Sequence, residues 1–262
     1  MKNNRYQCMI FICVLLLFSA ISGYAQSLKT LTYNIHHANP PSKADHIDLE
    51  AIARVIRDSG AELVALQEVD VRTERSGADS DQAEELGRLT GMRHYFAKAI
   101  DHQGGEYGVA ILSKHPFIST EKHPLPMAEG VGGEPRTIAM AVVEPHAGKR
   151  VIFACTHLDL KAENRLLQVR HIADLTAELD YPMILGGDFN AKPDSEAVRQ
   201  LDAHFQRSAI NKGFTIPVES PNREIDFIMF RPKGRFEVVR HEVIDEQYAS
   251  DHLPVYVELK FR

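Results

Sequence analysis

Hydrophobic residues recur along this chain in short runs of about four to eight positions, a length typical of buried β-strands. Turn-forming clusters such as residues 40–42 and 130–135 separate several of these runs. The pattern therefore predicts a protein rich in sheet. The predicted strands are residues 28–35, 63–66, 108–112, 137–143, 151–156, 183–185, 225–230, 236–243 and 255–259.

Between these runs, apolar residues recur with the period of a helix, and each predicted helix carries a single apolar stripe. A helix with one apolar stripe must cover the face of another element, so the chain is expected to form a layered α/β fold. The number of strands favours two sheets packed together with the helices outside. The stripes are Leu49, Ile52, Val55 and Ile56, then Ala83, Leu86 and Leu89, then Leu166, Val169, Ile172, Leu175 and Leu179.

Residues 1–25 have the pattern of a secretory signal peptide. Lys2 and Arg5 precede an apolar run over residues 9–21, and small residues follow up to Ala25, where cleavage is expected. The apolar run is shorter than the roughly 20 residues that a membrane-spanning helix needs, and no later run approaches that length. We therefore expect a soluble protein exported to the periplasm or the extracellular space.

Cleavage would leave residues 26–262, a length that suits one domain, with no Pro/Gly/Ser linker inside it. Loss of two basic residues and no acidic one changes the formal charge from −6 to −8. That charge gives no general attraction to nucleic acid or to anionic membranes. Cys155 would be the only remaining cysteine, so no intramolecular disulfide can form, and its apolar surroundings predict a buried thiol.

Polar side chains able to bind a metal ion or move a proton stand at the ends of the predicted strands. One such residue would be read as a turn former or a helix cap. Several of them could converge at one rim of the packed sheets and form a pocket of oxygen ligands with two imidazoles. They are Asn34, Glu68, His157, Asp188, Asn190, Asp226, Asp251 and His252.

Oxygen donors of this kind favour Mg²⁺ or Mn²⁺, and Glu68 suits the role of a principal ligand. Zinc is the competing interpretation because the chain has 13 histidines, but no HExxH motif or paired Cys/His spacing is present. His36 and His37 are adjacent, and on a strand they would point to opposite faces.

Two short segments carry most of the chemical signal. In ILGGDFN, two glycines precede Asp188, which we interpret as a close approach of the backbone to a ligand, with Asn190 on the same face as Asp188. In SDHLP, Asp251 stands beside His252 just before the last strand, and Asp226 is the expected carboxylate partner of His252.

Read together, the segments TYNIH, LQEVD, YGVAILSK, THLD, GGDFN, IDFI and SDHLP resemble the endonuclease/exonuclease/phosphatase superfamily. The resemblance covers the chain from residue 28 to about residue 259. It implies the family's α/β fold, a four-layer sandwich of two mixed sheets flanked by helices. It also implies a phosphoesterase whose active site lies at one edge of the sandwich.

The resemblance further implies roles for individual residues. Glu68, Asn34 and Asp251 match the metal-binding positions. Asp188 matches the group that orients or deprotonates water, and Asn190 one that binds the phosphate. His157 matches a residue that stabilises the transition state or protonates the leaving oxygen, with Glu106 or Tyr107 as its support. His252 matches the histidine paired with Asp226, and Arg165 is a substrate-binding candidate that is equally well explained as a surface ion pair.

The expected function is hydrolysis of a phosphodiester or phosphomonoester by in-line attack of water, with Mg²⁺ or Mn²⁺ as cofactor. The substrate class stays open among nucleic acid, which the charge does not favour, a phospholipid headgroup and an inositol phosphate. Two alternatives are a non-catalytic metal- or phosphate-binding module of the same fold and a glycosidase, which would leave the two histidines unexplained. The number of metal ions and the oligomeric state are not determined by the sequence.

Overall fold

The computed structural model describes residues 27–209 and 213–262. The predicted signal peptide at residues 1–25 lies outside the described residues. In the part that is described, no helix is long and apolar enough to span a bilayer. The strands are β1 (Ser27–Asn34), β2 (Leu63–Val71), β3 (Arg93–His102), β4 (Gly105–Ser113), β5 (Phe117–Pro124), β6 (Thr137–His146), β7 (Lys149–His157), β8 (Met183–Asp188), β9 (Gln206–Arg207), β10 (Asp226–Arg231), β11 (Phe236–Val243) and β12 (Val255–Phe261). The helices are η1 (His36–Ala38), α2 (Leu49–Ser59), α3 (Gln82–Thr90), α4 (Ala162–Leu175) and α5 (Glu196–His204).

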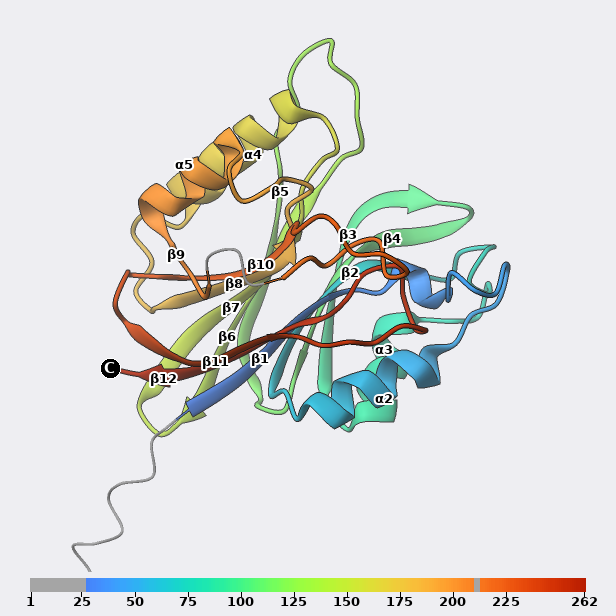
Figure 1. Ribbon diagram of the computed structural model, residues 1–262, viewed down its shortest axis with the longest axis horizontal. Helices are drawn as coiled ribbons and strands as arrows, with labels where there is room; N and C mark the ends of the chain where they lie inside the picture. Colours follow the sequence, from blue (N-terminus) through green and yellow to red (C-terminus); the bar gives the residue numbers. More distant parts are fainter. Residues whose placement is uncertain (1–26, 210–212) are drawn as a thin grey trace, which may run out of the picture.

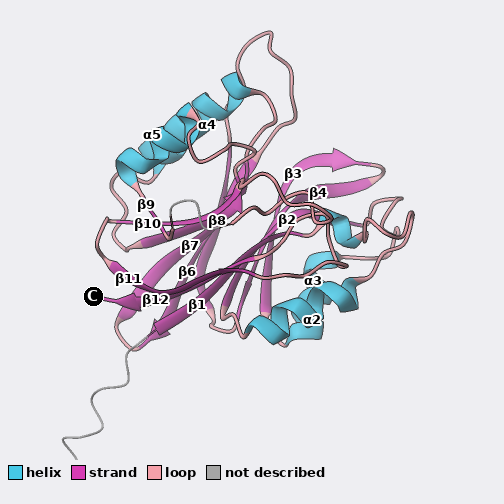
Figure 2. Cartoon of the chain, in the orientation of Figure 1, coloured by secondary structure: helices cyan, strands magenta, loops and turns pink. Residues whose placement is uncertain are grey.

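Two six-stranded sheets pack face to face, and helices cover the outer face of each (Figure 1). The first sheet has the strand order β11-β12-β1-β2-β4-β3, and the second has the order β5-β6-β7-β8-β10-β9. Both sheets are mixed, because β1 pairs in parallel with β2 and β7 in parallel with β8, while the other pairings are antiparallel. The chain therefore adopts the expected four-layer α/β sandwich, with α2 and α3 on one side and α4 and α5 on the other (Figure 2).

Three apolar clusters separate these four layers. The central cluster joins the facing sides of the two sheets, for example Leu63 and Ala65 with Phe153 and Ile184. A second cluster lies between the first sheet and its two helices, and a third between the second sheet and α4 and α5. The one-sided apolar stripes of the helices thus cover the outer faces of the sheets, as their periodicity indicated.

The sequence pattern missed the elements that lie at the margins of the fold. Strands β3 and β5 are sheet edges, and most of their side chains are exposed or half-buried, so they lack a continuous apolar run. Strand β9 is only two residues long. Helix α5 buries only Ala197, Val198 and Leu201, too few to show a clear stripe. Leu179, which the pattern assigned to the third helix, lies beyond the end of α4.

Candidate active site

Strand register brings three of the predicted site residues together on the second sheet. His157, the last residue of β7, is paired with Asp188, the last residue of β8. Asp188 is in turn paired with Asp226, the first residue of the antiparallel strand β10. Three polar groups separated by up to 69 positions in the sequence are therefore neighbours across adjacent strands. All three side chains are buried.

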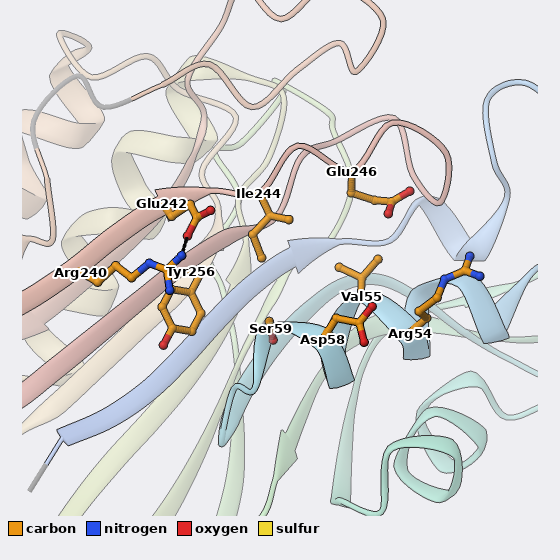
Figure 3. Close-up of a pocket in the computed structure, with 9 residues that line it drawn as sticks. All are labelled: Arg54, Val55, Asp58, Ser59, Arg240, Glu242, Ile244, Glu246 and Tyr256. Atoms are coloured by element: carbon orange, nitrogen blue, oxygen red, sulfur yellow. Dashed lines mark hydrogen bonds and ion pairs between the residues drawn. The ribbon is translucent and has the colours of Figure 1, made fainter.

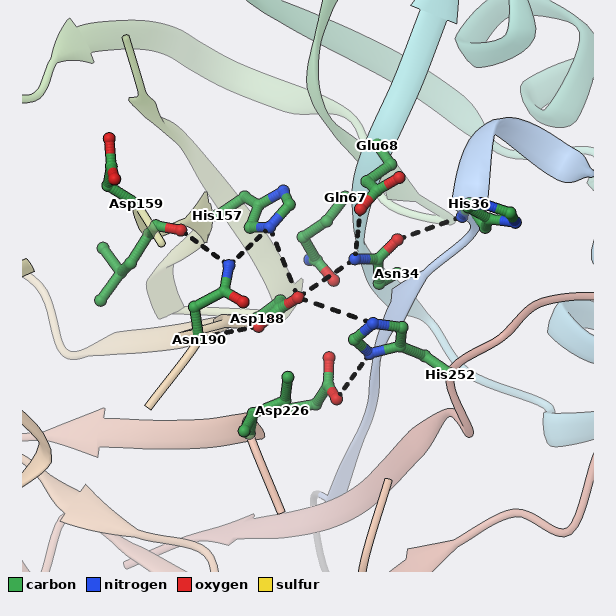
Figure 4. Close-up of polar contacts among 12 residues, drawn as sticks. Asn34, His36, Gln67, Glu68, His157, Asp159, Asp188, Asn190, Asp226 and His252 are labelled. Carbon is green, nitrogen blue, oxygen red and sulfur yellow. Dashed lines mark hydrogen bonds and ion pairs between the residues drawn. The ribbon is translucent and has the colours of Figure 1, made fainter. Parts of the chain in front are cut away.

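The first sheet contributes Asn34 and Glu68 to the same place (Figure 4). The Nδ2 atom of Asn34 donates to Glu68 Oε1 at 3.1 Å and to Asp188 Oδ2 at 3.1 Å. Its Oδ1 atom accepts a hydrogen bond from the backbone N–H of His36 at 3.1 Å. Asn34 therefore links the end of β1 to carboxylates from both sheets.

Glu68 is aimed by an irregularity in strand β2. The β2–β4 register shifts between Leu66 and Val69, and Glu68 itself has a φ of +59°. A bulge inserts an extra residue into a strand and re-aims the local side chains, and bulges are over-represented beside active sites. A positive φ is costly for a residue with a Cβ. The backbone is thus held in an unfavourable conformation at the residue expected to bind metal.

His252 lies between two carboxylates. Its Nδ1 atom is 2.9 Å from Asp226 Oδ2, and its Nε2 atom is 3.8 Å from Asp188 Oδ2. Burial opposes a charge on this imidazole, but the Asp226 carboxylate and its hydrogen bond outweigh it and raise the pKa of His252 to about 10. Burial, followed by repulsion from Asp226, raises the pKa of Asp188 above its usual range. The carboxylates of Asp188 and Asp226 together carry an excess of negative charge, and the imidazolium of His252 between them partly neutralises it.

His157 faces the same carboxylate from the other side. Its Nε2 atom is 3.4 Å from Asp188 Oδ2 and 3.0 Å from the amide nitrogen of Asn190. Burial, with Arg136 and His252 nearby, lowers the pKa of His157 well below its usual value. At neutral pH the two site histidines are therefore in different protonation states, His157 neutral and His252 charged.

The GGDFN segment works differently from our interpretation of it. A Cβ on Gly186 would lie 3.0 Å from Ala65 Cβ of the facing sheet, and one on Gly187 would lie 2.3 Å from the Thr156 carbonyl oxygen. The glycines therefore permit close packing within the sandwich rather than approach of a ligand. Asn190 is not on the strand face of Asp188: it follows β8 with a φ of +48°, and its backbone N–H donates to Asp188 Oδ1 at 2.8 Å.

Other sequence predictions meet a different geometry. His36 and His37 belong to η1 and have positive φ values of 46° and 44°, so they are not on a strand, and their rings lie 4.5 Å apart. Arg165 is half-buried on α4, where its guanidinium donates to the backbone carbonyl of Asp159 at 2.9 Å. In the described chain it makes no hydrogen bond or ion pair to the other predicted site residues.

Asp251 lies next to His252, and its carboxylate accepts a 3.4 Å hydrogen bond from Ser250 Oγ. Ser250 is fully buried and its hydroxyl donates to the backbone carbonyl of Asn34 at 2.7 Å, which ties the SDHLP segment to the end of β1. No hydrogen bond joins Asp251 to Glu68 or to the Asn34 side chain among the described residues.

Two contributors to the site were missed at the sequence level, Ser250 and Arg136. Arg136 is buried directly before β6, and its Nη1 atom is 3.0 Å from His157 Nδ1. The support expected for His157 was Glu106 or Tyr107: Glu106 pairs with Lys98 at 3.1 Å, whereas Tyr107 lines the same crevice as Arg136 and His157. The only available sequence signal was a basic residue one position before a predicted strand, a common arrangement with no specific meaning.

The donor set fits a divalent cation. Glu68, Asp188 and Asp226 bring three carboxylates to one place, and Glu68 has no ion pair in the described chain. Uncompensated carboxylates in a buried setting are costly, so the site favours a positive charge. Glu68 offers the carboxylate oxygens that Mg²⁺ and Mn²⁺ prefer, and the Asn34 amide could add Oδ1 by turning this atom, in place of Nδ2, toward Glu68. Ligand atoms of Asp188, Asp226 and His252 also lie within 4.8 Å of one another, which would suit a cation as well.

A pocket lies away from this cluster, between α2 and the β11–β12 pair (Figure 3). It contains an ion pair between Arg240 and Glu242 and the ring of Tyr256. None of the residues predicted for the active site lines it. The strand-end cluster, rather than this pocket, therefore gathers the chemistry.

Comparison of the sequence with known proteins gives one matching family description. The sequence profile of the endonuclease/exonuclease/phosphatase family matches residues 31–252. The uncharacterized protein YbhP of Escherichia coli (strain K12) is 26% identical over 247 residues, which cover 89% of this chain and 96% of YbhP.

Solved structures show the same fold. An endonuclease/exonuclease/phosphatase family protein from Bacteroides thetaiotaomicron superposes with a TM-score of 0.76 at 20% identity, covering 91% of this chain and 99% of that protein. A mannosyl-6-phosphatase from the same species superposes with a TM-score of 0.72 at 20% identity, covering 89% of this chain and all of that one.

Proposed function

Since this chain belongs to the endonuclease/exonuclease/phosphatase family, we propose that it is a divalent-metal-dependent phosphoesterase that hydrolyses its substrate by in-line attack of water. The observation that carries this proposal is the contact of Asn34 with Glu68 from its own sheet and with Asp188 from the other sheet, next to His252. Side chains that served only as turn formers or helix caps would have no reason to come together from both sheets.

Each side chain has a task that follows from its surroundings. Asp188 lies between two imidazoles, where its carboxylate can orient the attacking water and accept its proton. His252, held by Asp226, supplies a positive charge and a proton for the developing negative charge on the phosphoryl oxygens and the leaving group. Asn190, beside His157, can donate to the phosphate the side-chain N–H that does not bond the Leu158 carbonyl.

Mg²⁺ or Mn²⁺, when bound by Glu68, Asn34 and Asp251, would act as a Lewis acid that polarises the phosphoryl group. Arg165 is retained as a substrate-binding proposal that would require its side chain to leave the Asp159 carbonyl. We further propose that residues 1–25 are removed as a signal peptide and that residues 26–262 form the exported enzyme. Amino-terminal sequencing of protein from the periplasm and the medium would test this, and an intact residue 1 there would contradict it.

The function is tested by a hydrolysis screen with Mg²⁺, with Mn²⁺ and with a chelator. The substrates are plasmid DNA, RNA, sphingomyelin, phosphoinositides, a chromogenic phosphodiester and, because one structural relative is a mannosyl-6-phosphatase, a hexose 6-phosphate. We expect at least one to be hydrolysed in a metal-dependent way. Failure of every substrate with both metals would overturn the proposal, and tight metal binding without turnover would instead favour a non-catalytic binding module.

Two variants make the screen specific. His252→Ala removes the charged imidazole and should lower kcat roughly 10² to 10⁴-fold, as expected for the loss of a general acid or base. His204→Ala is the matched control, because His204 is an exposed histidine at the end of α5. Equal activity of the two variants would exclude His252 from the mechanism.

A further inference from the structure

The guanidinium of Arg136 lies against the ring of His157 in a buried crevice. Arg136 is 6% exposed, and its Nη1 atom lies 3.0 Å from His157 Nδ1 and 3.0 Å from Glu134 Oε1. The crevice beside these side chains, lined also by Tyr107 and Thr137, has no room for a water molecule. No water therefore lies between the guanidinium and Nδ1, and their contact is direct.

A guanidinium has five N–H donors, no acceptor, and keeps its charge at any pH a protein tolerates. The Nδ1 atom of His157 must therefore offer its lone pair to Arg136. A neutral imidazole has one N–H and one lone pair, so the ring proton of His157 is on Nε2. The partner of His252 has the opposite character, because the Asp226 carboxylate only accepts and requires a proton on Nδ1.

We propose that Arg136 is a positioning residue that fixes His157 as the Nε2–H tautomer, so that His157 acts as a hydrogen-bond donor to a phosphoryl oxygen and not as a proton-transfer group. The catalytic part of this inference rests on the proposed phosphoesterase function. It leaves His252 as the imidazole that exchanges a proton in the reaction. It also departs from the role of protonating the leaving oxygen, which was one of two that the family resemblance implied for His157.

Of the two neighbours of Nε2, the Asp188 carboxylate agrees with this assignment and the Asn190 amide must adjust to it. Asp188 Oδ2, an acceptor, lies 3.4 Å from Nε2 and can receive its proton in a weak hydrogen bond. The side-chain amide nitrogen of Asn190 is 3.0 Å from Nε2 and 2.9 Å from the Leu158 carbonyl oxygen. Because this nitrogen also carries only N–H donors, a proton on Nε2 requires the Asn190 amide to keep its hydrogen bond to Leu158 and to move away from the ring. A phosphoryl oxygen placed beside Asp188 could accept the Nε2–H in a hydrogen bond of normal length, in place of the 3.4 Å contact with Asp188 Oδ2.

The tautomer is read directly by long-range ¹H–¹⁵N correlation spectra of the full chain labelled with ¹⁵N in histidine, without substrate. A His157→Gln variant identifies the resonances of His157 by their disappearance. We expect His157 of the wild-type protein to show a single Nε2–H form at neutral pH. An Nδ1–H form or an imidazolium would overturn the proposal.

Three further variants separate positioning from a purely structural role. Arg136→Met keeps length but loses the donor, and should abolish the single tautomer and lower kcat roughly 10 to 100-fold, the usual cost of losing a group that orients an active-site ligand, with a smaller change in KM. Arg136→Lys keeps a donor and should restore the tautomer and part of the rate. Glu134→Gln removes the ion pair of Arg136 and should change neither the tautomer nor kcat.

The outcomes are distinguishable. If Arg136→Met loses the tautomer but keeps the wild-type kcat, or keeps the tautomer, positioning by Arg136 is refuted. If Arg136→Met does not fold, the wild-type spectrum and the Arg136→Lys variant still test the proposal. An Arg136→Lys variant that folds but lacks the Nε2–H form of His157 would also refute positioning by Arg136. Absence of any phosphoester hydrolysis by the wild-type protein would overturn the proposed function and not the assignment of the tautomer.

Discussion

Asp70 shows how a single charge is accommodated outside the active site. Its buried carboxylate accepts hydrogen bonds from Arg75 Nε at 2.7 Å and Nη2 at 2.9 Å, from Ser76 Oγ and from Thr73 Oγ1. Burial alone would raise the pKa of Asp70, but the hydrogen bonds from Arg75 and Ser76 outweigh it and lower that pKa below its usual value. A buried carboxylate is stable here because every neighbour is a donor.

Replacing Asp70 by Asn should therefore destabilise the fold by about 3 to 5 kcal/mol at neutral pH, since Arg75 would lose its charged partner. The folded-state pKa is lowered, so the stability that ionisation contributes is complete above the unfolded-state pKa of about 3.9. It is lost as the pH falls through the folded-state pKa. Urea unfolding of both proteins between pH 7 and pH 2 measures this, and a constant difference between them over that range would contradict it.

Cys155 gives a second prediction for a single side chain. Its Sγ atom donates to the Leu66 carbonyl oxygen at 3.3 Å and accepts from Gln67 Nε2 at 3.2 Å, in the centre of the sandwich. Burial raises the pKa of the thiol to about 12. Protein lacking residues 1–25 should not react with a thiol reagent until urea unfolds it. The absorbance of the chromophore that the reagent releases measures this reaction. A reaction before the unfolding transition would show that the core opens locally.

Strand β2 illustrates how one element stores strain for a site. Its bulge aims Glu68 at Asn34, with a left-handed backbone that a residue with a Cβ adopts at a cost of about 1 to 2 kcal/mol. In strand β8 the absence of side chains has the main effect, because its two glycines let the neighbouring strand and the facing sheet approach closely. In both strands the backbone, rather than the side-chain sequence alone, sets the geometry of the site.

The strain at Glu68 is measurable. Glu68→Gly and Glu68→Ala should both abolish metal-dependent activity, but Glu68→Gly should be the more stable of the two by about 1 kcal/mol, because glycine has no penalty at a φ of +59°. Urea unfolding without metal compares them. If the Glu68→Ala variant is as stable as the Glu68→Gly variant, the backbone at residue 68 is not strained.

Gly187→Ala should cost more stability than Gly186→Ala. The new Cβ at position 187 would collide with a backbone carbonyl of β7 at 2.3 Å, and strand pairing would have to shift. At position 186 it meets side-chain atoms at 3.0 Å or beyond. Overpacking typically costs about 1 to 3 kcal/mol, and we expect position 187 at the upper end of that range. Chemical denaturation of both variants tests the order, which equal losses would refute.

At the scale of the whole molecule, the site lies where both sheets and the segment before β12 meet. Its carboxylates belong to elements far apart in the chain, and the full sequence has a formal charge of −6. A cation held by Glu68 and Asn34 would bind the folded chain only, because in the unfolded chain these residues are 34 positions apart.

Mg²⁺ or Mn²⁺ should therefore raise the melting temperature, with a stabilisation of about 2.7 kcal/mol at a concentration 100 times the Kd. Glu68→Gln should remove most of this effect, whereas Glu242→Gln, in the pocket between α2 and the β11–β12 pair, should retain it. Differential scanning calorimetry with a metal titration measures the shift. A melting temperature that does not respond to either metal would refute a cation site at Glu68.

Much of the fold followed from local patterns. Strand β7 contains a continuous apolar run, β1 and β12 have apolar residues at alternating or adjacent positions, and α2 has a single apolar stripe, so these patterns indicated two sheets covered by helices. Exposed edge strands such as β3 and β5 have no such pattern, because one of their faces or edges is in water.

The sequence by itself determined which residues are candidates for the chemistry, since polar groups that end apolar strands stand out against the hydrophobic background. Only the tertiary structure decided how they meet. The pairing of His157 with Asp188 and of Asp188 with Asp226 is a matter of strand register. The bulge at Glu68 and the contact of Arg136 with His157, 21 positions away, depend on packing between segments distant in sequence. Such contacts leave no periodic signal, because only the folded backbone brings their partners into reach.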